Sequence, residues 1–167
     1  MKGIIISLFV VGCLAITQAQ SLVIEFESPQ DFRDFRLNSL TEERTARVFE
    51  REVTRALDST VERFVGEGRL HLTFTDIDLA GEIQPWRTRT GQDIRFVETL
   101  FPPRLDFRYV VKDANGEVVL EGETSQRDLA FMHRLGAGRS GSSFFFETQL
   151  LRDWIRRELQ SHLGESL

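Results

Sequence analysis

Apolar and polar residues alternate cleanly between residues 69 and 75 of this chain. Leu70, Leu72 and Phe74 fall on one face of that segment, and the residues between them are polar. A period of two is typical of a β-strand that buries one face. Two further segments predict short strands, at residues 22–26 and around Ile94 and Phe96.

The dipeptide Asn115-Gly116 lies between two further alternating segments and predicts a hairpin. This dipeptide suits a two-residue type I′ turn. With that turn, the residue numbers of each cross-strand pair sum to 231, so apolar residues meet on one face and opposite charges on the other. The predicted pairs are Val111 with Leu120, Tyr109 with Gly122, Arg108 with Glu123, and Phe107 with Thr124.

A helical period of apolar residues appears twice. Ser39, with Glu42 three residues later, fits a capping box at the start of the first helix, and Gly66 is placed to end that helix. Its apolar stripe consists of Ala46, Phe49, Val53, Leu57, Val61 and Phe64. The second helix is predicted over residues 143–163, with an apolar stripe of Leu150, Leu151, Trp154, Ile155 and Leu159.

These elements predict a single α+β domain over residues 20–167. We expect a mostly antiparallel sheet of four or five strands with two long helices packed on one face. The first strand, the first helix and the strand that begins at Arg69 are arranged to form a right-handed crossover.

Residues 1–19 differ in character from the rest of the chain and predict a secretory signal peptide. Lys2 is followed by an apolar run over residues 4–16, which is too short to span a membrane, and small residues occupy the positions before cleavage after Ala19. Cys13 offers an alternative, cleavage before this residue and a lipid anchor on it. The leader predicts a periplasmic or secreted protein.

Charge and cysteine usage exclude several function classes. Without Lys2, 20 basic residues stand against 26 acidic ones, so the exported domain carries no basic footprint for nucleic acid or for an anionic membrane. Cys13 is the only cysteine in the chain. Cleavage after Ala19 therefore leaves no disulfide, no thiolate nucleophile and no thiolate metal ligand.

Three carboxylates, Asp76, Asp78 and Glu82, lie close together where the strand from Arg69 ends. An EF-hand loop is excluded, because a calcium-ligating residue is missing from its fifth and twelfth positions. A looser metal site formed by these three residues remains an alternative.

Strand phase gives the two aspartates a structural explanation. A strand that continued unbroken past Phe74 would turn Asp76 and Asp78 into the core, and burying unpaired carboxylates costs several kcal/mol. We therefore expect a bulge or bend near Thr75 and Asp76, which returns Ile77 and Leu79 to the core and leaves the acids at the rim of the sheet.

The loop after Glu82 contains Trp86 between a proline and an arginine. A tryptophan in a polar loop is suited to anchor a partner, although it also commonly folds back over a sheet. We predict a surface that binds a ligand or a partner, formed by Asp76, Asp78, Glu82, Trp86, Arg87 and Arg95.

Two other motifs do not carry chemistry. Residues 136–141 match GxGxxG by letter, but the next helix is the last element of the chain, so the strand that a dinucleotide-binding unit requires is missing. Ser140, considered as a hydrolase pair with His133 or His162, lies in no nucleophile elbow, and His162 near a helix C-terminus suits the helix dipole as a cation.

Several blocks of the sequence resemble a bacterial family described as domain of unknown function 3016. The blocks are residues 74–82, 93–95, 102–107, the Asn115-Gly116 hairpin, 127–129 and 147–154. The resemblance implies an exported bacterial protein and supplies no activity, cofactor or catalytic residue. The chain departs from the family pattern after Leu135, where it is richer in glycine.

Taken together, the sequence favours an exported, non-catalytic binding or interaction domain without a cofactor, whose partner is an envelope protein or a small ligand. One alternative is a metal-binding protein or metal-dependent hydrolase that uses Asp76, Asp78 and Glu82. A second alternative is a structural accessory of the bacterial envelope.

Overall fold

The computed structural model describes residues 20–134 and 141–164. The predicted signal peptide with Cys13, and most of the glycine-rich segment with Ser140, lie outside these residues. No helix within the described ranges is long and apolar enough to cross a membrane.

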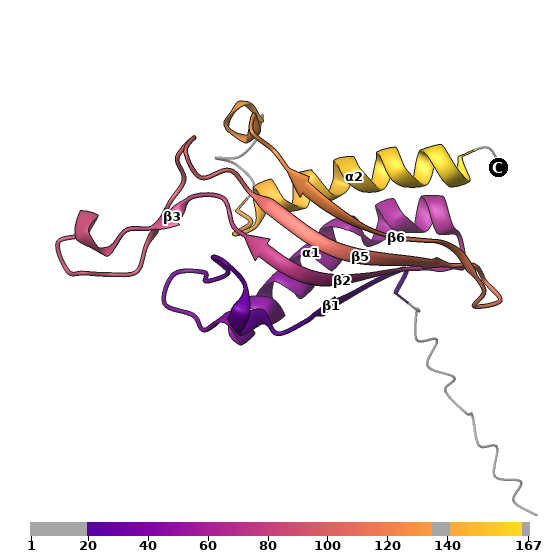
Figure 1. Ribbon diagram of the computed structural model, residues 1–167, viewed down its shortest axis with the longest axis horizontal. Helices are drawn as coiled ribbons and strands as arrows, with labels where there is room; N and C mark the ends of the chain where they lie inside the picture. Colours follow the sequence, from indigo (N-terminus) through magenta and orange to yellow (C-terminus); the bar gives the residue numbers. More distant parts are fainter. Residues whose placement is uncertain (1–19, 135–140, 165–167) are drawn as a thin grey trace, which may run out of the picture.

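The fold is α+β, as predicted. Its main sheet has the strand order β1-β2-β5-β6, in which β1 runs parallel to β2 and the other neighbours are antiparallel. The strands are β1 (Leu22–Phe26), β2 (Arg69–Asp78), β5 (Arg104–Lys112) and β6 (Val118–Arg127). A second, two-stranded sheet consists of β3 (Glu82–Ile83) and β4 (Arg95–Phe96), and it stands apart from the main sheet (Figure 1).

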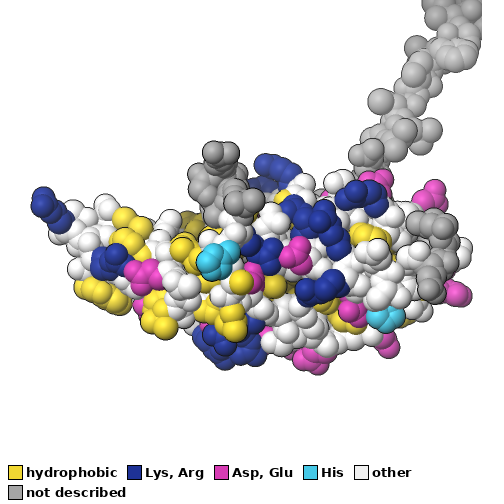
Figure 2. All heavy atoms as spheres, turned by 90° about the horizontal axis from the view of Figure 1, so that it is seen from above, with side chains coloured by type: hydrophobic (Ala, Val, Ile, Leu, Met, Phe, Trp, Pro, Cys, Tyr) yellow, Lys and Arg dark blue, Asp and Glu magenta, His cyan; other side chains and the backbone are white. Residues whose placement is uncertain are grey.

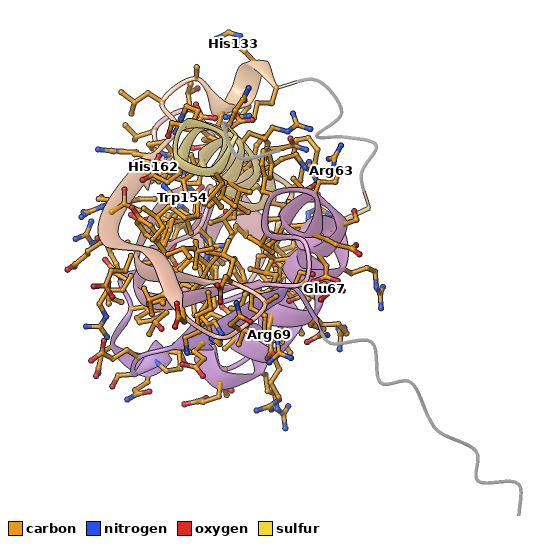
Figure 3. The ribbon with its side chains drawn as sticks, turned by 90° about the vertical axis from the view of Figure 1, so that its right-hand side faces the viewer. Arg63, Glu67, Arg69, His133, Trp154 and His162 are labelled. Carbon is orange, nitrogen blue, oxygen red and sulfur yellow. The ribbon has the colours of Figure 1, made fainter. Side chains whose placement is uncertain are left out.

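Helices α1 (Glu42–Val65) and α2 (Phe145–Leu163) lie side by side over the main sheet (Figure 1). The described residues also form three short 3-10 turns, η1 (Pro29–Asp31), η2 (Pro85–Arg87) and η3 (Phe131–His133). The core between helices and sheet is rich in aromatic rings. Trp154 of α2 is 2% exposed, contacts Phe107 and Tyr109, and points inward in Figure 3, whereas Arg63 lies on the outside of α1.

The first helix begins differently from the capping-box prediction. Thr41, not Ser39, is the N-cap, and its hydroxyl accepts a hydrogen bond from the Arg44 N–H at 3.4 Å. Residues 37–40 form a turn, in which the Leu40 N–H donates to the Leu37 carbonyl, so the chain enters the helix only at the second hydroxyl residue. The end of the helix at Gly66, with φ of 58°, agrees with the prediction.

The register of the β5–β6 hairpin is confirmed, but its turn is of another type. Only Gly116 has a positive φ, 85°, and its N–H donates to the Asp113 carbonyl at 3.0 Å. This is a type I turn followed by a left-handed glycine, whereas a type I′ turn also needs a positive φ at Asn115. An extra residue, Val119, lies opposite the step from Val111 to Lys112 and restores the predicted register.

The predicted bulge in β2 is also confirmed. The pairing of β2 with β5 shifts between Phe74 and Asp76, so Thr75 is the extra residue. Ile77 and Leu79 are consequently buried at 0% and 2% exposure, and the two aspartates remain at the rim. Beyond the bulge, β2 continues to Asp78, and the chain then leaves the main sheet at Gly81.

Candidate functional site

Residues 81–101, here called the arm, leave the end of β2, form the β3–β4 pair and return to β5. The arm projects beyond the end of the main sheet (Figure 1). Its base is closed by a hydrogen bond of 2.9 Å from the Gly81 N–H to the Phe101 carbonyl. Gly81 has φ of 82°, and a Cβ at this position would lie 2.3 Å from the Phe96 carbonyl oxygen. A glycine is therefore required where the arm begins.

Arg95 anchors the arm to the domain. Its side chain is only 8% exposed, and its Nη2 and Nη1 donate to the two carboxylate oxygens of Asp34 at 2.7 and 2.9 Å. The same guanidinium donates to the carbonyls of Arg36 and Gly81, each at 2.7 Å. These bonds join three separate segments, the loop after β1, the end of β2 and the returning strand β4.

Two further contacts tie the arm to the loop after β1. The Arg36 guanidinium donates to Asp93 at 2.7 Å, and the Arg95 N–H donates to the Asn38 side chain at 3.2 Å. Asn38 adopts a positive φ of 50°, which asparagine tolerates better than most residues. The base of the arm is therefore held to the loop after β1 by the side chains of Arg36 and Asn38 as well as by Arg95.

The carboxylates at the end of β2 each have a different environment. Asp76 accepts a hydrogen bond of 2.9 Å from the Arg33 N–H, and its other oxygen lies 3.8 Å from the Arg33 guanidinium. The backbone of Asp78 lies beside that of Asp34 in an isolated parallel β-bridge, in which the Leu79 N–H donates to the Asp34 carbonyl at 3.0 Å. Burial, and then the neighbouring charge of Asp34, raise the pKa of Asp78, although Arg33 opposes them. Glu82 accepts a hydrogen bond from the Gln84 side chain at 3.2 Å.

These three carboxylates do not converge on one point. Within residues 20–134 and 141–164, no group of three or more His, Cys, Asp or Glu side chains is arranged so that it could hold a metal ion. Asp76 is satisfied by Arg33, and Glu82 belongs to the arm. The structure therefore does not bring Asp76, Asp78 and Glu82 together as the ligands of one metal ion.

Trp86 and Arg87 lie in η2, on the outer part of the arm. Trp86 is 73% exposed, so it does not fold back over the sheet. The Arg87 guanidinium pairs with Glu98 and lies 4.3 Å from the centroid of the Phe96 ring. Arg87 is therefore used to hold the two sides of the arm together.

The arm also carries an exposed set of large apolar side chains, here called the arm patch. Its members are Trp86 (73% exposed), Ile94 (41%), Val97 (42%) and Leu100 (77%). Figure 2 shows hydrophobic side chains gathered toward this end of the molecule. Only Trp86 of this set was part of the surface predicted from the sequence.

Two residues of the site were not predicted from the sequence. Asp34, the partner of Arg95, lies in a loop without a motif. Glu147 is 2% exposed in α2 and accepts a hydrogen bond of 2.7 Å from the Ala80 N–H. Burial raises its pKa, against the opposing effects of the Ala80 N–H and of the Arg95 charge. Glu147 lies three residues before Leu150 on the buried stripe of α2, and that spacing was a usable signal.

A pocket of about 290 Å³ lies where the arm base meets the start of α2. It is lined by Arg95, Val97, Ser143, Phe145, Phe146 and Glu147, among others. Both charged groups in this set already have protein partners, Asp34 for Arg95 and the Ala80 N–H for Glu147.

No curated protein and no solved structure matches this chain. Residues 20–157 match the family described as protein of unknown function (DUF3016), which covers the sheet, the arm and most of α2. The chain belongs to the DUF3016 family.

Proposed function

We propose that this protein is a non-catalytic binding domain that is exported to the periplasm of a bacterium and docks an envelope protein through its arm. The observation that carries the proposal is the arm patch. Four of the eight large apolar side chains that are exposed in the described part of the chain lie within its 21 residues. A concentration of large exposed apolar side chains on one segment of a folded domain favours an interaction site there.

The composition of the arm patch suits a protein partner. Trp86 presents a large, amphipathic ring at low conformational cost, and tryptophan is among the residues that contribute most to binding energy at protein interfaces. Leu100 and Ile94 add aliphatic surface, while Arg89 and Thr90 are exposed polar neighbours. An apolar centre with a polar border is the usual anatomy of such an interface.

The anchoring of the arm supports the same proposal. The bonds of Arg95 to Asp34, Arg36 and Gly81 fix the base of the arm before any partner is present. Arg87 lies on the outgoing side of the arm and contacts Phe96 and Glu98 on the returning side, so it holds the two sides of the arm together. A pre-organised binding segment loses less conformational entropy on association than a flexible one.

The proposal is tested by affinity capture from periplasmic extract with the purified protein as bait. The bait variants are Trp86→Ser and Leu100→Ser, and the control is Arg63→Ser, which changes an exposed residue on the outside of α1. We expect one or a few proteins to be captured by the wild type and by Arg63→Ser, and to be lost with both arm variants. Capture of the same proteins by all four baits would contradict the proposed surface.

A further inference from the structure

Strand β6 forms one edge of the main sheet, and no other strand of residues 20–134 and 141–164 pairs with its outer side. It pairs with β5 on one side, and β1 forms the opposite edge of the sheet. β6 has ten residues and no proline, so each of its residues keeps a backbone N–H. An open edge of this length is able to accept another strand by backbone hydrogen bonding.

The backbone pairing shows which residues of β6 face the open edge. The Asp128 N–H donates to the Pro103 carbonyl at 3.3 Å, and this pair continues the register of the β5–β6 ladder. Hydrogen-bonded pairs alternate along an antiparallel ladder, so beyond the bulge at Val119 the even-numbered residues of β6, from Leu120 on, bond to β5. The odd-numbered residues turn their N–H and C=O groups outward; these are Glu121, Glu123, Ser125 and Arg127.

The outward residues complement a second copy of themselves in one register. If two β6 strands pair antiparallel about a two-fold axis at Thr124, Glu121 faces Arg127 of the second copy and Glu123 faces Ser125 of the second copy. These pairs, each formed twice, provide about eight backbone hydrogen bonds. A shift of the axis to Glu123 places two glutamates directly opposite each other, which is unfavourable. A shift of the axis to Ser125 leaves only Glu123, Ser125 and Arg127 within the paired segment, so fewer backbone hydrogen bonds form.

The charges at the ends of this register lack partners within one chain. Arg127 lies directly opposite Arg104 of β5, and Arg104 is already paired with Asp106. Among the described residues neither Arg127 nor Glu121 forms an ion pair, and both are exposed. The pairing about Thr124 brings each of them an opposite charge.

Exposed apolar residues provide an independent observation. Outside the arm, the large apolar side chains exposed in the described segments lie at the two ends of β6. Val118 and Val119 are 51% and 49% exposed at its start, and Leu129 and Met132 are 71% and 44% exposed just after its end. An antiparallel partner brings the start of one β6 to the end of the other. In this register Val119 therefore falls beside Leu129 of the second copy.

We propose that the protein forms a two-fold symmetric dimer in which two β6 edges pair antiparallel about Thr124, joining the two main sheets into one. Closed two-fold symmetry is the commonest arrangement of soluble homo-oligomers. The occupant of the edge is a second copy because the outward charges and the apolar ends of β6 complement each other within one sequence.

The test is sedimentation velocity of the purified protein over a concentration series. Glu123→Pro removes an outward N–H, which the ladder with β5 does not use, and Glu123→Ala is its matched control with the N–H retained. We expect a concentration-dependent dimer for the wild type and for Glu123→Ala, and a monomer for Glu123→Pro. Circular dichroism checks that the variants are folded.

A charge exchange tests the register. Arg127→Glu places like charges opposite each other at both ends, and we expect it to weaken dimerisation roughly tenfold. The double variant Glu121→Arg/Arg127→Glu restores opposite charges and should restore the dimer. A wild type that remains monomeric at every soluble concentration overturns the proposal. A dimer that is insensitive to Glu123→Pro, or a double variant as weak as Arg127→Glu, overturns it as well.

Discussion

Arg95 binds Asp34 through two parallel hydrogen bonds of 2.7 and 2.9 Å, although 61 residues separate them in the sequence. The pair fixes the returning side of the arm to the loop after β1. Because the Arg95 side chain is only 8% exposed, this bidentate pair is shielded from water on the arginine side.

Replacing Arg95 by lysine should destabilise the protein. Lysine keeps the charge but cannot donate in parallel to Asp34 and also reach the carbonyls of Arg36 and Gly81. We expect the free energy of unfolding in urea to fall by about 2 kcal/mol, since buried partners lose their hydrogen bonds. The matched control, Arg89→Lys, changes an exposed arginine of the same arm and should have almost no effect. Equal unfolding curves for the two variants would contradict the anchoring role.

Glu147 should make stability depend on pH in a defined direction. Burial raises its folded-state pKa above the ordinary carboxyl value, so the folded protein holds this proton more tightly than the unfolded chain does. The resulting stabilisation is present below the ordinary pKa and is lost as pH rises through the folded pKa. The free energy of unfolding of the wild type, relative to that of Glu147→Gln, should therefore decrease from pH 4 to pH 8.

Two variants separate the hydrogen bond of Glu147 from its charge. Glutamine can still accept the Ala80 N–H, so Glu147→Gln should be at least as stable as the wild type at neutral pH. Glu147→Ala leaves that buried N–H without a partner and should be about 2 kcal/mol less stable than Glu147→Gln at every pH. A wild type that gains stability relative to Glu147→Gln as pH rises would reverse the predicted sign.

Tyr109 should ionise far above the usual range of tyrosine. Burial, together with the hydrogen bond of 2.8 Å that its hydroxyl donates to Glu158, raises its pKa to about 12. Tyr109 is the only tyrosine of the chain, so the ultraviolet absorbance of tyrosinate reports on it alone. Glu158→Gln should lower the midpoint of that titration. A midpoint near 10 in the folded wild type would show that the hydroxyl is not held as described.

The hairpin turn gives a prediction that distinguishes two turn types. Gly116 has φ of 85°, and a Cβ there would meet no atom within 4 Å, so Gly116→Ala tests backbone strain alone. We expect a loss of about 1 kcal/mol. Asn115→Ala should cost less, because Asn115 does not have a positive φ. In a type I′ turn both substitutions would be costly, and thermal unfolding of the two variants separates the cases.

The alternation of apolar and polar residues was sufficient to predict the bulge in β2 and the register of the β5–β6 hairpin. Alternation about Phe74 required an extra residue to keep Ile77 in the core, and the bulge at Thr75 provides it. Residue matching across β5 and β6 likewise gave the right register, because it was supported by many pairs at once. The predicted turn type was wrong, because Asn-Gly also suits a type I turn followed by a left-handed glycine. The extra residue Val119 compensates for the different turn, so the register of the pairs beyond it is the same for both turn types.

The candidate site depends on contacts that no local pattern contains. Arg95 and Asp34 are joined only after β1, β2 and β4 are in place, and one carboxylate in a loop is not distinguishable by sequence from a solvated one. Leu100 and Val97 carried no signal either, because single apolar residues in loops are common on protein surfaces. Their grouping on a projecting arm became visible only in three dimensions.

The proposed binding role of the arm is tested most directly by site-specific photo-crosslinking in living cells. A photoreactive amino acid replaces Trp86 or Leu100 in the arm patch, or Arg63 on the outside of α1 as the control. We predict that the two arm positions yield the same discrete adduct with an envelope protein and that position 63 yields none. The absence of an adduct from both arm positions, or the same adduct from position 63, would contradict the account.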